Sequence, residues 1–313
     1  MPALRSPHPL LYATRSGALP ARFRRERVLL VGCGDVGLRV ARTLGPRVRL
    51  LALTSSQDRV QTLRERGITP LVGNLDKPAS LRRLAGLATR VVHLAPPLES
   101  GMGDPRTRHL LAVLRQRAPV QRLVYGSTSG VYGDCQGDIA IETRAVNAGT
   151  ARAQRRIDAE RRVRHFGRAT GARVNVLRIP GIYAPDRVGG TPRERLLKGT
   201  PVLRSPDDVY TNHIHADDLA RACVAALWRG QPGRVYNVND DSVLKMGDYF
   251  DLAADLYHLP RPPRIAREGA QNQLPLMLLS FMSESRRMDN SRLKKELNLV
   301  LRYPTVAQGL LAQ

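Results

Sequence analysis

Residues 27–40 read RVLLVGCGDVGLRV, and this stretch decides the fold. An apolar run leads directly into Gly32-x-Gly34-x-x-Gly37, and apolar side chains then recur at helical spacing. The order predicts a strand, a tight turn and a helix, the context in which glycines at this spacing indicate dinucleotide binding. Gly32 would allow the tight turn, Gly34 would let the backbone approach a diphosphate, and Gly37 would let helix and strand pack closely. The alternative is a turn of the same shape that binds nothing.

The helix after the turn would offer its N-terminus to the phosphates. The first N–H groups of a helix lack partners inside it, and they lie at the positive end of the helix dipole. Such a terminus binds phosphate groups. We therefore expect Asp35, Val36 and Gly37 to complete the phosphate site that Gly32 and Gly34 begin.

The overall composition is that of an ordinary globular protein. The chain has 313 residues, of which 42% are hydrophobic and 25% charged, which is enough for one large domain or two modest ones. No apolar run approaches the ~20 residues that span a bilayer, so we expect no membrane partner. The three cysteines, Cys33, Cys135 and Cys223, form no Cys-x-x-Cys pair, which favours a reducing compartment without disulfides or structural zinc.

The chain is strongly basic, with a formal net charge of +23. Such a charge attracts phosphorylated ligands or nucleic acid. Only five of the 50 basic residues are lysine, however, and the arginines are spread along the whole chain, as a coding bias would produce. Aromatic residues, which nucleic-acid modules interleave with basic ones, make up only 4%. We therefore expect a small-molecule partner and no nucleic acid.

Residues 1–26 differ from the rest of the chain. They are rich in arginine, proline and small residues, and Glu26 is their only acid. This composition resembles a transit peptide weakly, and it lacks the continuous apolar segment of a secretory signal. We expect a disordered extension or a start codon placed too early, and a cytoplasmic protein.

Beyond residue 27, apolar runs alternate with helical patterns. This rhythm predicts an α/β protein with a Rossmann-like, doubly wound parallel sheet. It assigns residues 27–180 to a dinucleotide-binding domain to which residues 209–240 return, and residues 181–208 and 241–313 to a smaller, discontinuous C-terminal substrate lobe. The predicted strands are 28–31, 48–53, 69–72, 91–95, 122–125, 173–179 and 235–238, and the predicted helices are 57–66, 79–87, 106–117, 151–166, 216–228 and 246–256.

Five later segments resemble a known family when taken in order. They are VVHLA at 91–95, YGSTSGVYGD at 125–134, VLRIPGIYAP at 176–185, NHIHADDLA at 212–220 and YNV at 236–238. Together they resemble the extended short-chain dehydrogenase/reductase superfamily, of the NAD-dependent epimerase/dehydratase type. The resemblance implies an NAD(P)-binding oxidoreductase or epimerase that acts on a carbonyl or sugar-like substrate, nucleotide sugars included.

The same resemblance implies roles for several residues. Thr128 matches the family's catalytic hydroxyl, and Tyr132, four residues later, is a second catalytic candidate. Residues at the end of the fourth strand and in the IPGIY segment would pass the cofactor; these are Leu94, Ala95, Pro96, Pro180 and Ile182.

The chain departs from the family at its proton-transfer pair. The family places Tyr-x-x-x-Lys on the helix after the fifth strand, and these positions fall here on Arg152 and Arg156. Arginine stays protonated at any working pH, so Arg152 cannot replace the phenol as a general base. Arg156 could still donate to the nicotinamide ribose. The family's first nucleotide glycine is also replaced, by Val31.

Two interpretations of this departure remain open. In the first, the protein still transfers a hydride, and another group carries the proton, such as Tyr132, Tyr183, His215 or Cys135. In the second, it is a catalytically silent NAD(P)-binding sensor or regulatory module.

The second predicted strand favours NADP over NAD. NAD-specific sites place an acid near the end of this strand, where it holds the ribose hydroxyls. Here the strand ends in neutral residues, and Thr54, Ser55 and Arg59 could donate to a 2′-phosphate. Asn74 and Leu75 stand where the family has residues close to the adenine.

The substrate site is the least defined part. We expect Tyr183, Arg187, His215 and Arg286 to contribute to it, because arginine grips anionic groups through paired hydrogen bonds. No set of residues has the spacing of a metal site, so we expect no metal. By analogy with the family, we also expect a homodimer formed through the helices at 106–117 and 151–166.

Overall fold

The computed structural model describes residues 25–117 and 120–312. Its centre is a seven-stranded sheet in the order β12-β7-β5-β4-β1-β2-β3, and every neighbouring pair is parallel. The strands are β1 (Arg27–Val31), β2 (Arg49–Thr54), β3 (Thr69–Val72), β4 (Arg90–His93), β5 (Arg122–Thr128), β7 (Arg173–Ile179) and β12 (Val235–Asn237). The predicted doubly wound α/β fold is confirmed.

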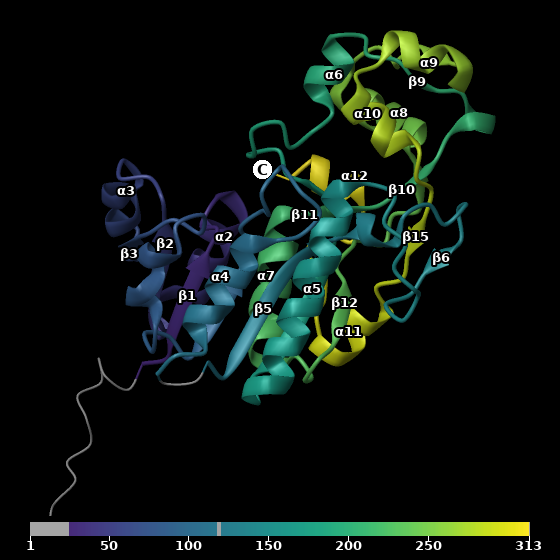
Figure 1. Ribbon diagram of the computed structural model, residues 1–313. Helices are drawn as coiled ribbons and strands as arrows, with labels where there is room; N and C mark the ends of the chain where they lie inside the picture. The colour runs from purple at the N-terminus through teal and green to yellow at the C-terminus, as the bar shows by residue number, and fades with distance from the viewer. Residues whose placement is uncertain (1–24, 118–119, 313) are drawn as a thin grey trace, which may run out of the picture.

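Helices cover both faces of this sheet (Figure 1). Successive side chains of a strand point to opposite faces, so Val28 and Leu30 pack on one side of β1 and Leu29 and Val31 on the other. The first face is covered by α2 (Asp35–Leu44), α7 (Ala216–Arg229) and α11 (Ser291–Leu297). The second is covered by α4 (Pro105–Leu114) and α5 (Ala151–Thr170). Burial on both faces explains why these strands are almost wholly apolar.

Two local expectations need correction. The segment predicted as a helix at 79–87 forms a 3-10 helix, η2 (Pro78–Leu84). The helix predicted at 57–66 is present as α3 (Arg59–Glu65). Residues 1–24 of the predicted extension lie outside the described residues. Glu26 belongs to the domain, because its carboxylate accepts a 2.6 Å hydrogen bond from the Thr89 hydroxyl and also pairs with Arg90.

A second lobe carries a core of its own, which Figure 1 shows apart from the sheet. It contains α6 (Arg193–Leu197), β9 (Val202–Leu203), α8 (Met246–Tyr257), β14 (Arg264–Ile265), α9 (Arg267–Gln273), α10 (Leu276–Met282) and α12 (Val306–Leu310). The chain enters it after β8 (Gly181–Tyr183) and leaves it through β11 (His213–His215), which pairs with β8. The sequence assigned all of 241–313 to this lobe, but Leu293, Leu297 and Leu299 pack with the α2 and α7 face instead.

The remaining strands form short pairs around the second lobe. They are β6 (Ile139–Ala140) with β15 (Arg287–Met288), and β10 (Tyr210–Thr211) with β13 (Leu244–Lys245). The first pair ties the segment after β5 to the C-terminal part of the chain, and the second joins residues 210–211 to residues 244–245. They bring residues that are distant in the sequence to one side of the sheet.

Candidate functional site

The glycine loop joins β1 to α2, and its three glycines have different surroundings. Gly32 has φ +89°, and a Cβ there would overlap the backbone of Ala95, with the Cα of that residue 2.7 Å away. A Cβ on Gly37 would lie 2.8 Å from the carbonyl oxygen of Gly32. At Gly34 a Cβ would meet nothing within 4 Å. Gly32 and Gly37 are therefore required by the fold, whereas Gly34 keeps a space open.

That space belongs to a cleft of about 960 Å³ at the carboxyl ends of β1, β4 and β5. Ligands of open parallel sheets bind at this edge. We call it the cofactor cleft. Many of the residues predicted for the cofactor line it, namely Gly32, Gly34, Asp35, Val36, Gly37, Leu94, Pro96, Arg156, Pro180 and Ile182, together with Thr128. Ala95 lies behind Gly32, where its N–H donates to the carbonyl of Val31.

A carboxylate stands in the first turn of α2, beside the phosphate loop. Asp35 pairs with Arg39 at 3.1 Å and with Arg187 at 3.4 Å. Arg39 is only 4% exposed and also binds Asp186 and Asp217, both at 2.6 Å. Arg187 was predicted to bind substrate, but its guanidinium lies here and also donates to the carbonyl of Ile182. These guanidiniums offset the charge that Asp35 would otherwise present to a diphosphate.

The residues predicted for the adenosine end lie beside this cleft and do not line it. Arg59 donates to the carbonyl of Cys33 in the glycine loop, and the Thr54 hydroxyl donates to the carbonyl of Ser56. The amide oxygen of Asn74 accepts from its neighbour Asp76. Leu75 is buried in the core. Ser55 is exposed at the end of β2.

Two arginines line the cofactor cleft where α5 begins. Thr150 caps this helix by accepting from the N–H of Ala153, and Arg152 and Arg156 then follow one turn apart. Arg156 donates to the carbonyl of Gly126 at 2.7 Å and to the Tyr125 hydroxyl. Burial lowers the pKa of Arg152, and the charge of Arg156 lowers it further. Even so, a guanidinium remains a proton donor that cannot accept a proton.

Tyr132, predicted as catalytic, is turned away from this cleft. It ends the 3-10 helix η3 (Ser129–Tyr132), is 1% exposed, and donates to Oδ1 of Asn237 at 2.7 Å. Burial raises the pKa of its phenol. Cys135 is buried too, and burial raises the pKa of its thiol. Neither residue is among the described residues that line this cleft or the cleft beside it, which corrects both assignments.

A second cleft, of about 670 Å³, adjoins the first. We call it the substrate cleft. Thr128, Arg152, Pro180 and Ile182 line both clefts, so a molecule in one can reach a molecule in the other.

Of the four residues predicted for substrate, two line this cleft, whereas Arg187 and His215 do not. Tyr183 and Arg286 line it. His215 instead caps α7, where its Nδ1 accepts from the N–H of Asp217 at 3.2 Å. That assignment is corrected because the side chain faces the helix end and the ring of Tyr303.

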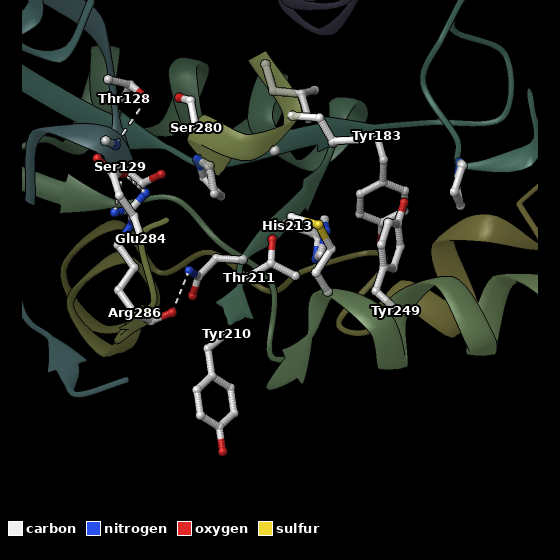
Figure 2. Close-up of a pocket in the computed structure, with 18 of the residues that line it drawn as sticks. Thr128, Ser129, Tyr183, Tyr210, Thr211, His213, Tyr249, Ser280, Glu284 and Arg286 are labelled. Carbon is white, nitrogen blue, oxygen red and sulfur yellow. Dashed lines mark hydrogen bonds and ion pairs between the residues drawn. The ribbon is translucent and has the colours of Figure 1, made fainter. Parts of the chain in front are cut away.

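Several residues that line the substrate cleft were missed by the sequence analysis. Figure 2 shows Tyr183 and Tyr249 on one side of it and Thr128 and Glu284 on the other, with His213 between them. The ring of His213 lies 4.1 Å from that of Tyr249. Burial lowers the pKa of His213 to about 4, so its imidazole is neutral at neutral pH. Arg195 also lines this cleft.

A family model now places this arrangement among known proteins. The model described as the NAD dependent epimerase/dehydratase family matches residues 28–239, which include both arginines of α5 and most of the cofactor cleft. The chain belongs to this family.

Relatives cover nearly the whole chain. Protein YeeZ of Escherichia coli strain K12 is 25% identical over 291 residues, which are 89% of this chain and 97% of that protein. A functionally unknown conserved protein from Silicibacter pomeroyi DSS is 31% identical, with a TM-score of 0.78 over 91% of this chain and 96% of that chain. The UDP-glucose 4-epimerase of Thermotoga maritima, solved with UDP-glucose, has a TM-score of 0.73 at 18% identity over 90% and 96% of the two chains. The last likeness concerns the fold alone.

Membership of the NAD dependent epimerase/dehydratase family implies a nicotinamide dinucleotide, and the cofactor cleft fits one. Gly34 leaves room for a diphosphate, and the N-terminus of α2 supplies N–H groups beside it. Arg156 lines the same cleft. Within residues 25–117 and 120–312, no cluster of histidine, cysteine, aspartate and glutamate could hold a metal ion. Across the same ranges, no helix is both long and apolar enough to pass through a bilayer.

Proposed function

We propose that this protein is an NAD(P)-dependent oxidoreductase or epimerase that acts on a carbonyl or sugar-like small molecule. The observation that carries the proposal is the junction of the two clefts at Thr128 and Arg152. A dinucleotide along the first cleft and a substrate in the second would meet at that point. Hydride transfer requires two adjoining binding sites, because the reacting atoms must be held within about 3–3.5 Å of each other.

Each part of the junction has a chemical task. The phosphates would lie on Gly32, Gly34 and the first N–H groups of α2, and Arg156 would donate to the ribose. The bound nicotinamide supplies or accepts the hydride. Thr128 lines both clefts, and its hydroxyl would hydrogen-bond the reacting oxygen. Arg152 would donate to that oxygen and stabilise negative charge on it, as positioned donors do in other enzymes.

We further propose that NADP is preferred to NAD. The end of β2 offers Thr54 and Ser55 in place of the carboxylate that would repel a 2′-phosphate. Arg59 already lies against the glycine loop through its bond to Cys33. A calorimetric titration should give tighter binding of NADPH than of NADH, and Arg59→Gln should weaken NADPH binding selectively. Equal or tighter binding of NADH would overturn the preference.

A second candidate function follows from the altered proton-transfer pair. An arginine at position 152 cannot accept a proton, and Tyr132 is buried away from both clefts. These observations support a catalytically silent NAD(P)-binding sensor. Both functions require cofactor binding and differ only in turnover.

Turnover separates the two. We would incubate the protein with NADPH and a panel of carbonyl compounds, including 4-keto sugars, and follow loss of the reduced nicotinamide absorbance. Substrate-dependent oxidation that Thr128→Ala abolishes supports the enzyme. An epimerase returns its hydride and consumes no NADPH, so nucleotide sugars are also incubated with the NADP-loaded protein and their epimers are followed by NMR. Tight cofactor binding with neither oxidation of NADPH nor epimerisation supports the sensor.

A further inference from the structure

We propose that the substrate of this protein is an acid, and that Arg195 binds its oxyanion, a carboxylate or a phosphoryl group, in the substrate cleft. The inference rests on the proposed function and names the class of molecule that the second cleft receives. It also assigns a role to a residue on α6, in the second lobe and away from the arginines of α5 (Figure 1).

The described residues leave the guanidinium of Arg195 only partly supplied with hydrogen-bond acceptors. It lines the substrate cleft, yet its Nε and Nη2 atoms are buried without a partner among the described residues. Its central carbon lies 4.2 Å from the centre of the Phe250 ring. The ring attracts positive charge, but its face offers no lone pair of the kind that N–H groups need. A buried charge without a partner is costly, so native proteins usually pair it.

The charges around the cleft leave Arg195 unneutralised. Its described lining residues include the guanidiniums of Arg152, Arg195 and Arg286 and the single carboxylate of Glu284. That carboxylate is already engaged, because both Nη atoms of Arg286 lie 2.8 Å from one of its oxygens. Burial lowers the pKa of Arg195, and the phenol of Tyr249 opposes this shift, but arginine remains charged at any working pH. The cleft therefore carries excess positive charge that an anionic ligand would balance.

The surroundings of Arg195 also suit an acid with an apolar body. Tyr249, Phe250 and Met246 of α8 line the cleft next to it, and Leu278 of α10 adds a further apolar side chain. The contact with Phe250 holds the guanidinium in place, so little side-chain freedom is lost on binding. Arginine recognises carboxylate and phosphoryl groups through paired, charge-assisted hydrogen bonds.

The test compares Arg195 with its neighbour on the same helix. Arg193 is exposed, does not line the cleft, and lies over the ring of Tyr257 on α8. Arg193→Gln thus removes the same charge from the same helix beside a similar aromatic contact. Hexanoate and UDP serve as probes, because they carry a carboxylate and a diphosphate respectively. Each is titrated calorimetrically into the wild-type protein and into Arg195→Gln, Arg195→Lys and Arg193→Gln, with and without saturating NADP.

We expect Arg195→Gln to weaken binding of at least one probe about tenfold or more, the loss typical of a charged hydrogen bond. Arg195→Lys should retain part of the affinity, and Arg193→Gln should stay within about twofold of wild type. If Arg195→Gln weakens the binding of hexanoate alone, the group that Arg195 binds is a carboxylate. If it weakens the binding of UDP alone, that group is a phosphoryl group. The proposal is overturned if neither probe binds the wild type, or if the two glutamine variants bind alike. Each variant is also titrated with NADP. Wild-type affinity for NADP shows that the variant is folded and that the cofactor binding required by the proposed function is intact, so a loss of probe binding can then be assigned to the substrate cleft.

Discussion

Alanine substitutions at Gly34 and Gly32 should separate cofactor binding from folding. At Gly34 the backbone has φ −80°, which alanine adopts freely, and the added Cβ meets nothing within 4 Å. The lower entropy of the unfolded chain favours alanine by roughly 0.4–1 kcal/mol, and the poorer helix start opposes it by a similar amount. We therefore expect the free energy of unfolding of Gly34→Ala to stay within about 1 kcal/mol of wild type.

The same methyl group should damage the binding of NADPH. It would stand in the open space where a diphosphate approaches the backbone, and a surplus methyl in a close contact costs about 1–3 kcal/mol. The dissociation constant for NADPH should therefore rise by about fivefold to more than a hundredfold. Isothermal titration calorimetry measures this directly.

Gly32→Ala should instead weaken the fold. Its φ of +89° is unfavourable for alanine, and the new Cβ would overlap the backbone of Ala95. Left-handed strain of about 1–2 kcal/mol and overpacking of about 1–3 kcal/mol give a loss of roughly 2–5 kcal/mol. Urea denaturation followed by circular dichroism would measure it. The reasoning is refuted if Gly34→Ala loses as much stability as Gly32→Ala, or if it binds NADPH as tightly as wild type.

Three further predictions concern buried polar groups. Tyr132→Phe removes a hydroxyl that donates to Asn237, so the free energy of unfolding should fall by about 1 kcal/mol. The affinity for NADPH should not change, and an altered affinity would show that Tyr132 reaches the cofactor cleft. Glu160→Ala leaves Arg178 charged and buried without its partner at 2.9 Å, and urea denaturation should show a loss of about 3–5 kcal/mol; a loss below about 1 kcal/mol would contradict the pairing. Burial raises the pKa of Asp240 from 3.8 to about 8, so the native state holds a proton that the unfolded state releases between these values, and stability should fall as pH rises across this window. Asp240→Asn should flatten that slope, and an unchanged slope would assign it to other groups.

The fold and the conformation of the glycine loop could be read from the sequence because both depend on local signals. The apolar run, the glycine spacing and the helical pattern of residues 27–40 lie within one short stretch, and each constrains the backbone directly. Thr128 and Arg156 were placed by a family pattern that continues through β5 and α5. These are the parts of the chain where neighbours in sequence remain neighbours in space.

The substrate cleft could not be read in the same way. Tyr132 meets its acceptor Asn237 across 105 residues, and no local pattern shows which way the phenol turns. Arg187 follows a family-like loop, but it pairs with Asp35 of the first lobe. Arg195 is one of many arginines in an arginine-rich chain, and only the packing of α6 against α8 singles it out.

The guanidinium of Arg39 has a mechanical consequence. It holds carboxylates from the start of α2, from the loop after β8 and from the start of α7. Arg187 fastens that same loop to Asp35. Displacement of this loop therefore separates Arg187 from Asp35, the residue that follows Gly34. Ion pairs thus join the loop after β8 to the start of α2, which lines the cofactor cleft. A molecule that displaces this loop also changes the electric field at the position of the diphosphate.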